Sequence, residues 1–571
     1  MLWTGPDRFV PDAASRGRRT LPLVMIVPAL LILMVWPRGA LAAPAHGPLL
    51  QPVDPPQSGP LFTVNSADDP VEGDSVCSEL HCTLREAIAA SGSVAGATIQ
   101  FAPTLAGATI TLTNPLDIYW DLVIEGPATS RITVSGDDAY TIFYIYADWY
   151  AEVSPDVTMR NLNLVSGRDD GESGGGAVNI DVATVTLESV QIADSDAGFS
   201  GGGAIKLWSG ELTVRDSALV NNRTDGDGGA INNQYGTVNL VNTTLSGNKA
   251  DGWGGALAGY EFVTEGGLES SPFNLDFVTI TANRADADND ATGSGGAFYN
   301  IGAGAVTNSI VAGNRAGAVD DDCGTNTSTT WSRNLVGVGC PATGAGVLQL
   351  GAGALTGVTV ADVLAPSLAA NGGATVTHAL IAGSPALDAA QCGDVASDQR
   401  GEPRPDPVGA QCDMGAFELQ QQPDVYFTTE SRAVAESTGA VSLTVELSSP
   451  APQPITVTVQ LSSTAAIPGV DFTPAGGTIT IAQGADTGSL SVTINDDDIV
   501  EGDEEVTATL TSAAGAVIST PPRSCSPSRT TTPPASSCPP ASRPRPKRAA
   551  ASSSATPMTS APCGRRPHRH V

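Results

Sequence analysis

Acidic residues crowd the segment 496–504, which reads Asp-Asp-Asp-Ile-Val-Glu-Gly-Asp-Glu. So many carboxylates in one short loop repel each other unless a hard cation neutralises them. Ca²⁺ takes about six to eight oxygen ligands at ~2.3–2.6 Å, and a loop of this composition offers such oxygens. The segment therefore predicts a calcium site. The alternative is a solvated acidic turn, because acidic runs are usually solvated.

Carboxylate pairs that could cleave a glycosidic bond also occur, at Asp169-Asp170 and at Asp225/Asp227. Glycoside hydrolysis needs two carboxylates that flank the bond, ~5–9.5 Å apart. These pairs fall in glycine-rich turns, where they are more simply turn formers or loose calcium ligands. Only two histidines lie between residues 50 and 520. A polysaccharide lyase or glycoside hydrolase is therefore the alternative function, and we expect no enzyme.

Six of the nine cysteines lie in three close pairs, Cys77/Cys82, Cys323/Cys340 and Cys392/Cys412. A zinc site needs four ligands close together, and these cysteines have no Cys-x-x-Cys spacing and few histidines nearby. An exported chain can keep such pairs oxidised. We therefore predict a disulfide within each pair, since short loops close most readily.

The first 42 residues predict a signal peptide. Arginines precede the apolar run Leu21–Trp36, and Ala-Leu-Ala at 40–42 offers a small-x-small cleavage site. An uncleaved anchor helix is the alternative, but the run is shorter than the ~20 residues that cross a bilayer. Residues 43–60 are expected to form a linker. We expect a secreted or cell-surface protein whose mature chain has no integral membrane span.

An internal repeat determines which elements position these groups. The tripeptide Gly-Gly-Ala begins at Gly175, Gly202, Gly228, Gly254 and Gly295, in steps of 27, 26, 26 and 41 residues. The long step contains an insertion, 260–272, that carries three glutamates: Glu261, Glu265 and Glu269. This loop interrupts the repeat, so it is where we would look first for a binding surface or for catalysis.

Between the glycine turns lies an eleven-residue block with aliphatic residues at its third and eighth positions. The third positions are Met159, Leu187, Val214, Leu240, Leu275 and Val306. The last position is Asn in four blocks, at Asn222, Asn248, Asn283 and Asn314. Stacked at the ~4.8 Å strand spacing, such blocks bury a continuous core and align the asparagines in a ladder. A β-propeller needs ~40 or more residues per blade, so the spacing predicts an all-β, right-handed parallel β-helix.

The repeat resembles that of polymorphic outer-membrane proteins and related bacterial surface β-helices. The segment Cys-Thr-Leu-Arg-Glu-Ala-Ile at 82–88 is similar to the one that opens many of these helices, and Thr83 with Glu86 predicts a capping box. Motifs at 371–373, 383–388, 398–401 and 412–418 resemble the choice-of-anchor Q domain. That resemblance implies a location near surface-anchoring modules and no activity.

After residue 420 the sequence contains longer segments in which polar and apolar residues alternate, at 442–447, 455–461, 478–481 and 489–494. These segments predict the strands of a β-sandwich. Val-Ala-Glu at 434–436, Gly-Val-Asp-Phe at 469–472 and the acidic segment after Asn495 resemble a Calx-beta domain. The resemblance implies Ca²⁺ binding at one end of the sandwich. The matching positions are Glu436, Asp471, Asp496, Asp497, Glu501 and Glu504, with the Ile499 carbonyl. The aspartates that this family carries after its last strand are missing, so we expect an incomplete and weak site.

The last segment, 521–571, has no Asp or Glu and is rich in Pro, Ser, Ala and Arg. One interpretation is a basic, wall-binding linker. We favour the other, a shifted reading frame, because the change cuts the sandwich before its final strand. In either case this composition predicts a disordered tail.

The chain is thus expected to contain a signal peptide (1–42), a linker (43–60), a β-helix (61–363), its choice-of-anchor Q-like C-terminal part (364–419), a Calx-beta-like sandwich (420–520) and the tail (521–571). The formal net charge of −32 repels nucleic acid and anionic membranes. We expect a monomeric, surface-displayed scaffold or adhesin-like protein. Its partner would be a cell-surface or matrix glycan or protein.

Overall fold

The computed structural model describes residues 59–519 apart from short gaps at 71–75, 93, 95, 148–153, 172–173, 200, 265–266, 325–328, 342–343, 407–409, 421, 430, 452 and 497–501. The predicted signal peptide and the basic tail lie outside the described residues. No helix within the described part of the chain is long and apolar enough to cross a membrane. The all-β fold class is confirmed, with a parallel β-helix over residues 97–336 followed by a β-sandwich.

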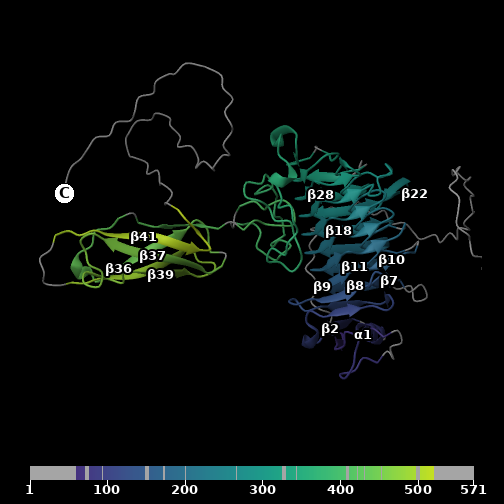
Figure 1. The fold of residues 1–571 in the computed structure, drawn as a ribbon, viewed down its shortest axis with the longest axis horizontal. Helices are drawn as coiled ribbons and strands as arrows, with labels where there is room; N and C mark the ends of the chain where they lie inside the picture. Colours follow the sequence, from purple (N-terminus) through teal and green to yellow (C-terminus); the bar gives the residue numbers. More distant parts are fainter. Residues whose placement is uncertain are drawn as a thin grey trace, which may run out of the picture. The chain divides into compact units, whose positions relative to one another are not determined.

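The first sheet of the β-helix contains a long main ladder, and Figure 1 shows its strands stacked from α1 and β2 at one end to β28 near the other. The main ladder contains β1 (Leu61–Val64), β2 (Ala97–Phe101), β5 (Leu122–Glu125), β8 (Asp156–Arg160), β11 (Val178–Glu188), β14 (Ile205–Arg215), β18 (Thr237–Val241), β24 (Phe273–Asp276), β28 (Ala305–Thr307) and β32 (Thr330–Ser332). A second ladder of the same sheet, called the side ladder below, is formed by the first halves of β11 and β14 with β4 (Leu116–Ile118), β7 (Phe143–Tyr146), β17 (Ile231–Asn233), β21 (Leu257–Gly259) and β27 (Phe298–Tyr299).

Two further sheets complete each coil. The second sheet contains β3 (Thr109–Thr111), β6 (Ile132–Ser135), β9 (Leu162–Val165), β12 (Gln191–Ala193), β15 (Ala218–Val220), β19 (Thr244–Ser246), β25 (Thr279–Thr281), β29 (Ile310–Val311), β33 (Leu335–Val336) and β34 (Leu348–Gln349). The third contains β10 (Arg168–Asp169), β13 (Asp196–Ala197), β16 (Arg223–Thr224), β20 (Lys249–Ala250), β26 (Arg284–Ala285), β30 (Arg315–Ala316) and β31 (Val319–Asp320). All strand pairs in these two sheets are parallel except β30 with β31.

The core follows the repeat in register. Leu187 pairs with Met159 on one side and with Val214 on the other, and the predicted third-position aliphatics continue in this way through Val306. All of them are fully buried. The bend after this strand has left-handed backbone at Asn161, Ser189, Asp216, Asn242 and Asn308, residue types that tolerate this conformation, and also at Phe277, whose type does not favour it.

The asparagine ladder is confirmed. The side-chain oxygen of each Asn accepts from the backbone N–H and from the side-chain amide of the Asn one coil earlier. Asn248 accepts both bonds from Asn222 at 3.0 Å, and Asn283 accepts them from Asn248 at 2.9 and 2.8 Å. After Asn314 the column ends on Asp322, whose Oδ1 accepts from the Asn314 backbone at 2.7 Å and from its amide at 2.8 Å. A buried carboxylate therefore closes a stack of neutral amides.

This carboxylate predicts a pH dependence. Burial raises the pKa of Asp322 to about 7, against the opposing effect of the N–H groups of Asn314 and Val338. Between about pH 4 and pH 7 the folded chain keeps the proton of Asp322, whereas the unfolded chain has released it. The stability that this protonation contributes is therefore fully present below pH ~4 and is lost as the pH rises through about 7. We expect the free energy of unfolding to fall by about 4 kcal/mol over this window from this group, at ~1.4 kcal/mol per pKa unit.

Denaturant unfolding at a series of pH values tests this expectation. Asp322→Asn should flatten the slope, because it keeps the shape and removes the titration. Asp320→Asn, at a carboxylate whose side chain is 65% exposed, is the matched control and should leave the slope unchanged. Equal slopes for wild type and Asp322→Asn would contradict the assignment.

The N-terminal cap is confirmed as well. Helix α1 (Leu84–Ser91) begins with the predicted capping box, in which Thr83 accepts the Glu86 N–H at 3.2 Å and Glu86 accepts the Thr83 N–H at 2.8 Å. The Arg85 guanidinium bonds the buried Asp69 carboxylate at 2.7 Å. Arg85 and Glu86, the two charged residues of the motif at 82–88, therefore both make bonds that hold the N-terminal cap together.

Residues 364–419 do not extend the stack, although the sequence predicts the C-terminal part of the helix there. They fold back over the outer face of the second sheet, shown in green beside the stack in Figure 1. Gln399 accepts from Thr244 at 2.6 Å, His378 bonds Ser246 at 2.9 Å, and the Ala416 N–H donates to Thr279 at 2.9 Å.

The three predicted disulfides are present in the structure. Cys77–Cys82 lies beside the N-terminal cap, Cys323–Cys340 lies near the end of the stack, and Cys392–Cys412 lies within the fold-back segment.

The sandwich contains two antiparallel sheets with one parallel edge pair, β35 with β42. The first contains β35 (Asp424–Phe427), β36 (Ala440–Leu447), β38 (Phe472–Thr473), β40 (Thr487–Ile494) and β42 (Val517–Ile518), and the second β37 (Ile455–Ser463), β39 (Gly476–Ile481) and β41 (Val506–Ala514). The four strands predicted from alternation correspond to β36, β37, β39 and β40. Val425, Val445, Val457, Phe472 and Ile481 form the centre of its core.

Candidate functional site

The acidic segment 496–504, predicted to bind calcium, follows strand β40 of the sandwich. The N–H of Ile494, the last residue of this strand, donates to the Gly439 carbonyl at 2.7 Å. Gly439 closes the short turn that begins with Glu436. Asp496 follows two residues after Ile494. The predicted ligands Glu436 and Asp496 therefore lie at the same end of the sandwich.

Asp471 and Glu504 lie at this end too. The Asp471 carbonyl accepts from the Asn495 N–H at 2.9 Å, and one oxygen of its carboxylate accepts from the Ile467 N–H at 2.6 Å. Glu504 comes two residues before β41, whose first residue, Val506, pairs with the last residue of β37. Three loops thus place four of the predicted ligand positions at the same end of the sandwich, although no three of these carboxylates come within 4.8 Å of one another in the described part of the chain.

The described carboxylates of this end face solvent. Glu436, Asp496 and Glu504 are exposed, and Asp471 is half-buried. The remaining predicted ligands, Asp497, Ile499 and Glu501, lie outside the described residues. An exposed end of this kind can be reached by a hydrated cation.

Among the described residues, a different set of three carboxylates has the spacing expected of a metal site. One oxygen each of Asp286, Asp288 and Asp290 lies within 4.8 Å of the others. Sequence reasoning overlooked these residues, although their alternating Asp-x-Asp-x-Asp spacing occurs in calcium loops. The glycine and the glutamate that complete such a loop are missing here. Asp286 already accepts the Ala291 N–H at 2.9 Å, which explains this side chain as a turn former.

The acidic pairs considered for catalysis lie in turns, apart from Asp169, which is the last residue of the short strand β10. Asp169 accepts the Gly171 N–H at 2.6 Å, and Asp227 accepts the Trp253 N–H at 2.8 Å and the Tyr260 hydroxyl at 2.8 Å. Asp225 pairs with Arg223 at 3.0 Å. The bonds of Asp169 and Asp225 are local, as expected of turn formers, whereas those of Asp227 connect its turn to the next coil.

The insertion at 260–272 forms a β-hairpin of β22 (Glu261–Thr264) and β23 (Gly267–Ser270). Glu261 opens the first strand and is exposed, and it pairs with Ser270 across the hairpin. Glu265 lies outside the described residues. A hairpin that emerges from the stack explains the long step in the repeat without any active-site constellation.

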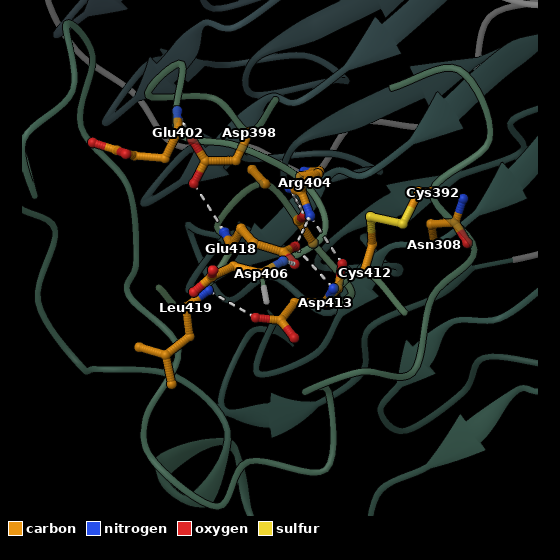
Figure 2. A network of polar contacts seen from close by, with 12 residues as sticks. Asn308, Cys392, Asp398, Glu402, Arg404, Asp406, Cys412, Asp413, Glu418 and Leu419 are labelled. Atoms are coloured by element: carbon orange, nitrogen blue, oxygen red, sulfur yellow. Dashed lines mark hydrogen bonds and ion pairs between the residues drawn. A yellow bond between two sulfur atoms is a disulfide. The ribbon is translucent and has the colours of Figure 1, made fainter. Parts of the chain in front are cut away.

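The most strongly buried charges lie in the fold-back segment. Figure 2 shows the Arg404 guanidinium facing Glu418, with Nη1 to the Glu418 carboxylate at 2.7 Å and Nη2 to the Gly415 carbonyl at 2.7 Å. The guanidinium also lies 4.3 Å from the centre of the Phe277 ring. Both charged side chains have no exposed surface. A substrate could not reach this pair, so we interpret it as a structural lock.

Asp398 and Asp413 complete this network in Figure 2. Asp398 accepts from the Arg400 guanidinium at 2.7 Å and from the Glu418 N–H at 2.9 Å. Asp413 accepts from the Leu419 N–H at 2.7 Å, and burial raises the pKa of its carboxyl to about 6. The motifs at 398–401 and 412–418 thus hold the fold-back segment together.

No curated protein sequence is similar to the chain. Eleven chains of solved structures match it, among them one described as the crystal structure of the apo-form Calx CBD1 domain. That chain is 21% identical, covers 18% of this chain and 88% of its own length, and has a TM-score of 0.17. Residues 418–528 match the Calx-beta domain family, which confirms the resemblance of the sandwich to that family and extends it past residue 520.

Proposed function

We propose that the chain is an exported, surface-displayed β-helical scaffold with an adhesin-like binding role and a calcium-binding Calx-beta module. The regular stack supports this role most directly, since its recurring polar groups belong to ladders and turns that build the fold. The apolar N-terminal segment with its cleavage pattern and the three disulfides support export. A monomer anchored near other surface modules fits the choice-of-anchor Q-like motifs.

The calcium module is proposed from the match to the Calx-beta family and from the position of Glu436, Asp471, Asp496 and Glu504 in loops at the same end of the sandwich. These carboxylates repel each other in the absence of a cation. A bound Ca²⁺ ion therefore stabilises the folded sandwich over the unfolded chain.

The test is calorimetric unfolding of the full chain with Ca²⁺ and with a chelator. We expect Ca²⁺ at a hundred times its Kd to stabilise the sandwich by about 2.7 kcal/mol. Asp496→Asn should remove most of this gain. Asp486→Asn is the matched control, because Asp486 is exposed at the opposite end of β40. A melting temperature that does not respond to Ca²⁺ would rule out the site.

A polysaccharide lyase or glycoside hydrolase is the second candidate. The β-helix architecture is compatible with it, but fold alone does not establish activity. Since the acidic pairs are engaged in bonds within turns and between neighbouring coils, the scaffold remains the better-supported function.

A further inference from the structure

Lys206, in the side ladder, is the only lysine that is buried in the part of the chain that the structure describes. It is 2% exposed, although lysines are almost never buried without a partner. It lies in β14 directly opposite Asn232 of β17, one coil later in the stack. Asn232 has no exposed surface. The strand register therefore places a primary amine beside a carboxamide in a site that excludes water.

The two side chains are in direct contact. Lys206 Nζ lies 2.7 Å from the Asn232 side-chain oxygen, Oδ1, and 3.3 Å from Gln234 Oε1. The centre of the Trp208 ring lies 4.9 Å from Nζ. Gly201 packs against the amide, since a Cβ at this glycine would lie 2.4 Å from Asn232 Nδ2. Amine and amide are therefore fixed next to each other, and such proximity replaces a bimolecular encounter.

Lys206 also meets the chemical requirement for a nucleophile, which is an amine that has lost its proton. Burial lowers the pKa of Lys206 to about 8, against the opposing effect of the Asp227 charge. A fraction of the amine is therefore uncharged near neutral pH. Because water is excluded from the amide, hydrolysis does not compete with attack by this amine.

A hydroxyl group lies at the nitrogen that would have to leave. Asn232 Nδ2 donates to the Tyr260 hydroxyl at 3.3 Å and to the Asp227 carbonyl at 3.0 Å. The Tyr260 hydroxyl in turn donates to Asp227 Oδ2 at 2.8 Å. Burial raises the pKa of Tyr260, so this hydroxyl keeps its proton at neutral pH. Tyr260 and Asp227 thus form a hydrogen-bonded pair that can deliver a proton to the leaving nitrogen.

We propose that Lys206 and Asn232 react with each other and form an intramolecular isopeptide bond between adjacent coils. The uncharged Nζ attacks the side-chain carbonyl carbon of Asn232, and an electron pair of the C=O bond moves to Oδ1. The proton lost by Nζ passes to the Asp227–Tyr260 pair, and the Tyr260 hydroxyl gives a proton to Nδ2. The carbonyl then forms again, the bond between carbon and Nδ2 breaks, and one molecule of ammonia leaves. The reaction needs no oxidant and no further reactant.

The new bond joins β14 to β17 and closes a loop across 26 residues of sequence. Such a cross-link stabilises the fold chiefly by restricting the unfolded chain, as a disulfide does. Unlike a disulfide, an amide is not broken by thiol exchange. This self-modification does not depend on the binding role or on the calcium module proposed for the chain.

Mass spectrometry of the full chain, reduced, denatured and digested with trypsin, tests the proposal. Trypsin should not cleave after Lys206, and the peptide that contains this lysine should be joined to the peptide 224–249, which contains Asn232. The joined mass should equal the sum of the two peptides less one ammonia, and fragmentation should place the branch at Asn232. Complete cleavage after Lys206 would overturn the proposal, as would a branch to Gln234. A succinimide at Asn232 loses the same ammonia but leaves Lys206 cleavable, so it would overturn the proposal too.

Variants separate the chemistry from the fold. Lys206→Met and Asn232→Ala should each abolish the joined peptide, whereas Lys249→Arg, at an exposed lysine of β20, should keep it. Tyr260→Phe keeps the ring and removes the hydroxyl, so the freshly purified variant should be only partly joined. Its joined fraction should then grow faster at about pH 9 than at about pH 6, because Lys206 loses its proton between these values.

Melting curves identify the variants that keep the fold. The comparison within wild type needs no variant, so a variant that does not fold leaves the main test intact. A folded Tyr260→Phe chain that is fully joined when purified would overturn the proton transfer assigned to Tyr260. A joined peptide that persists in Asn232→Ala would overturn the assignment of Asn232.

Discussion

Glu418→Gln should lower the free energy of unfolding of the β-helix by about 3–5 kcal/mol, because it leaves the Arg404 guanidinium buried without its counter-charge. Arg404 donates to the Glu418 carboxylate at 2.7 Å and to two backbone carbonyls, of Asp413 at 3.0 Å and of Gly415 at 2.7 Å. The carbonyls alone cannot neutralise a full charge away from water. Denaturant unfolding of purified wild type and variant measures the difference.

The exposed pair of Arg315 and Asp320, 3.0 Å apart, is the matched control. Asp320→Asn should change stability by less than about 1 kcal/mol, since exposed ion pairs contribute little. The double variant Arg404→Met/Glu418→Leu should recover much of the loss, because the unpaired charge is gone. A loss below about 1 kcal/mol for Glu418→Gln would contradict the structural lock.

Asn248→Ala should destabilise the β-helix by at least about 4 kcal/mol. Its Oδ1 accepts from the Asn222 backbone and side chain at 3.0 Å each, and its Nδ2 donates to the Leu219 carbonyl at 2.9 Å and to Asn283 at 2.8 Å. Each buried group left without a partner costs about 1–3 kcal/mol. The substitution breaks four bonds at once, and alanine replaces none of them.

Asn239→Ala is the matched control for the ladder. Asn239 lies on the same coil and is half-buried, and it bonds the side chains of Glu211 at 2.8 Å and Asn274 at 2.9 Å at the surface. Water can replace these bonds, so we expect a loss below about 1 kcal/mol. Equal losses for the two variants in denaturant unfolding would show that the ladder is not a main source of stability.

The repeat predicts the stack well because each of its signals has a fixed spacing along the sequence. The aliphatic at the third position of each block pairs with its equivalent one coil away, as Leu187 does with Val214, and the asparagines at the last position meet in the same way. The capping box at Thr83 and Glu86 spans three residues. Each depends on a spacing that can be read in the sequence.

The fold-back segment could not be predicted in the same way. Thr244 and Gln399 are bonded across 155 residues, and no periodic pattern connects them. The motif that contains Gln399 indicates a distinct segment without indicating what it covers. Four strands of the sandwich are missing from the sequence prediction. β35, β38 and β42 are each only two to four residues long, whereas β41 has nine residues and was overlooked.

The candidate sites likewise differ in how far the sequence alone predicts them. Strand order brings Glu436 and Asp471 to one end of the sandwich, and a family resemblance can predict that. The spacing of Asp286, Asp288 and Asp290 was readable and was overlooked.

The most direct test of the scaffold function is an assay for turnover by the purified full chain on pectin, alginate, related polyuronides and neutral glucans, with and without Ca²⁺. Reducing ends report hydrolysis, and unsaturated products report elimination. We expect neither to exceed the rate measured with heat-denatured protein. Turnover that Glu261→Gln or Glu265→Gln abolishes would contradict the scaffold function and place an active site at the β22–β23 hairpin.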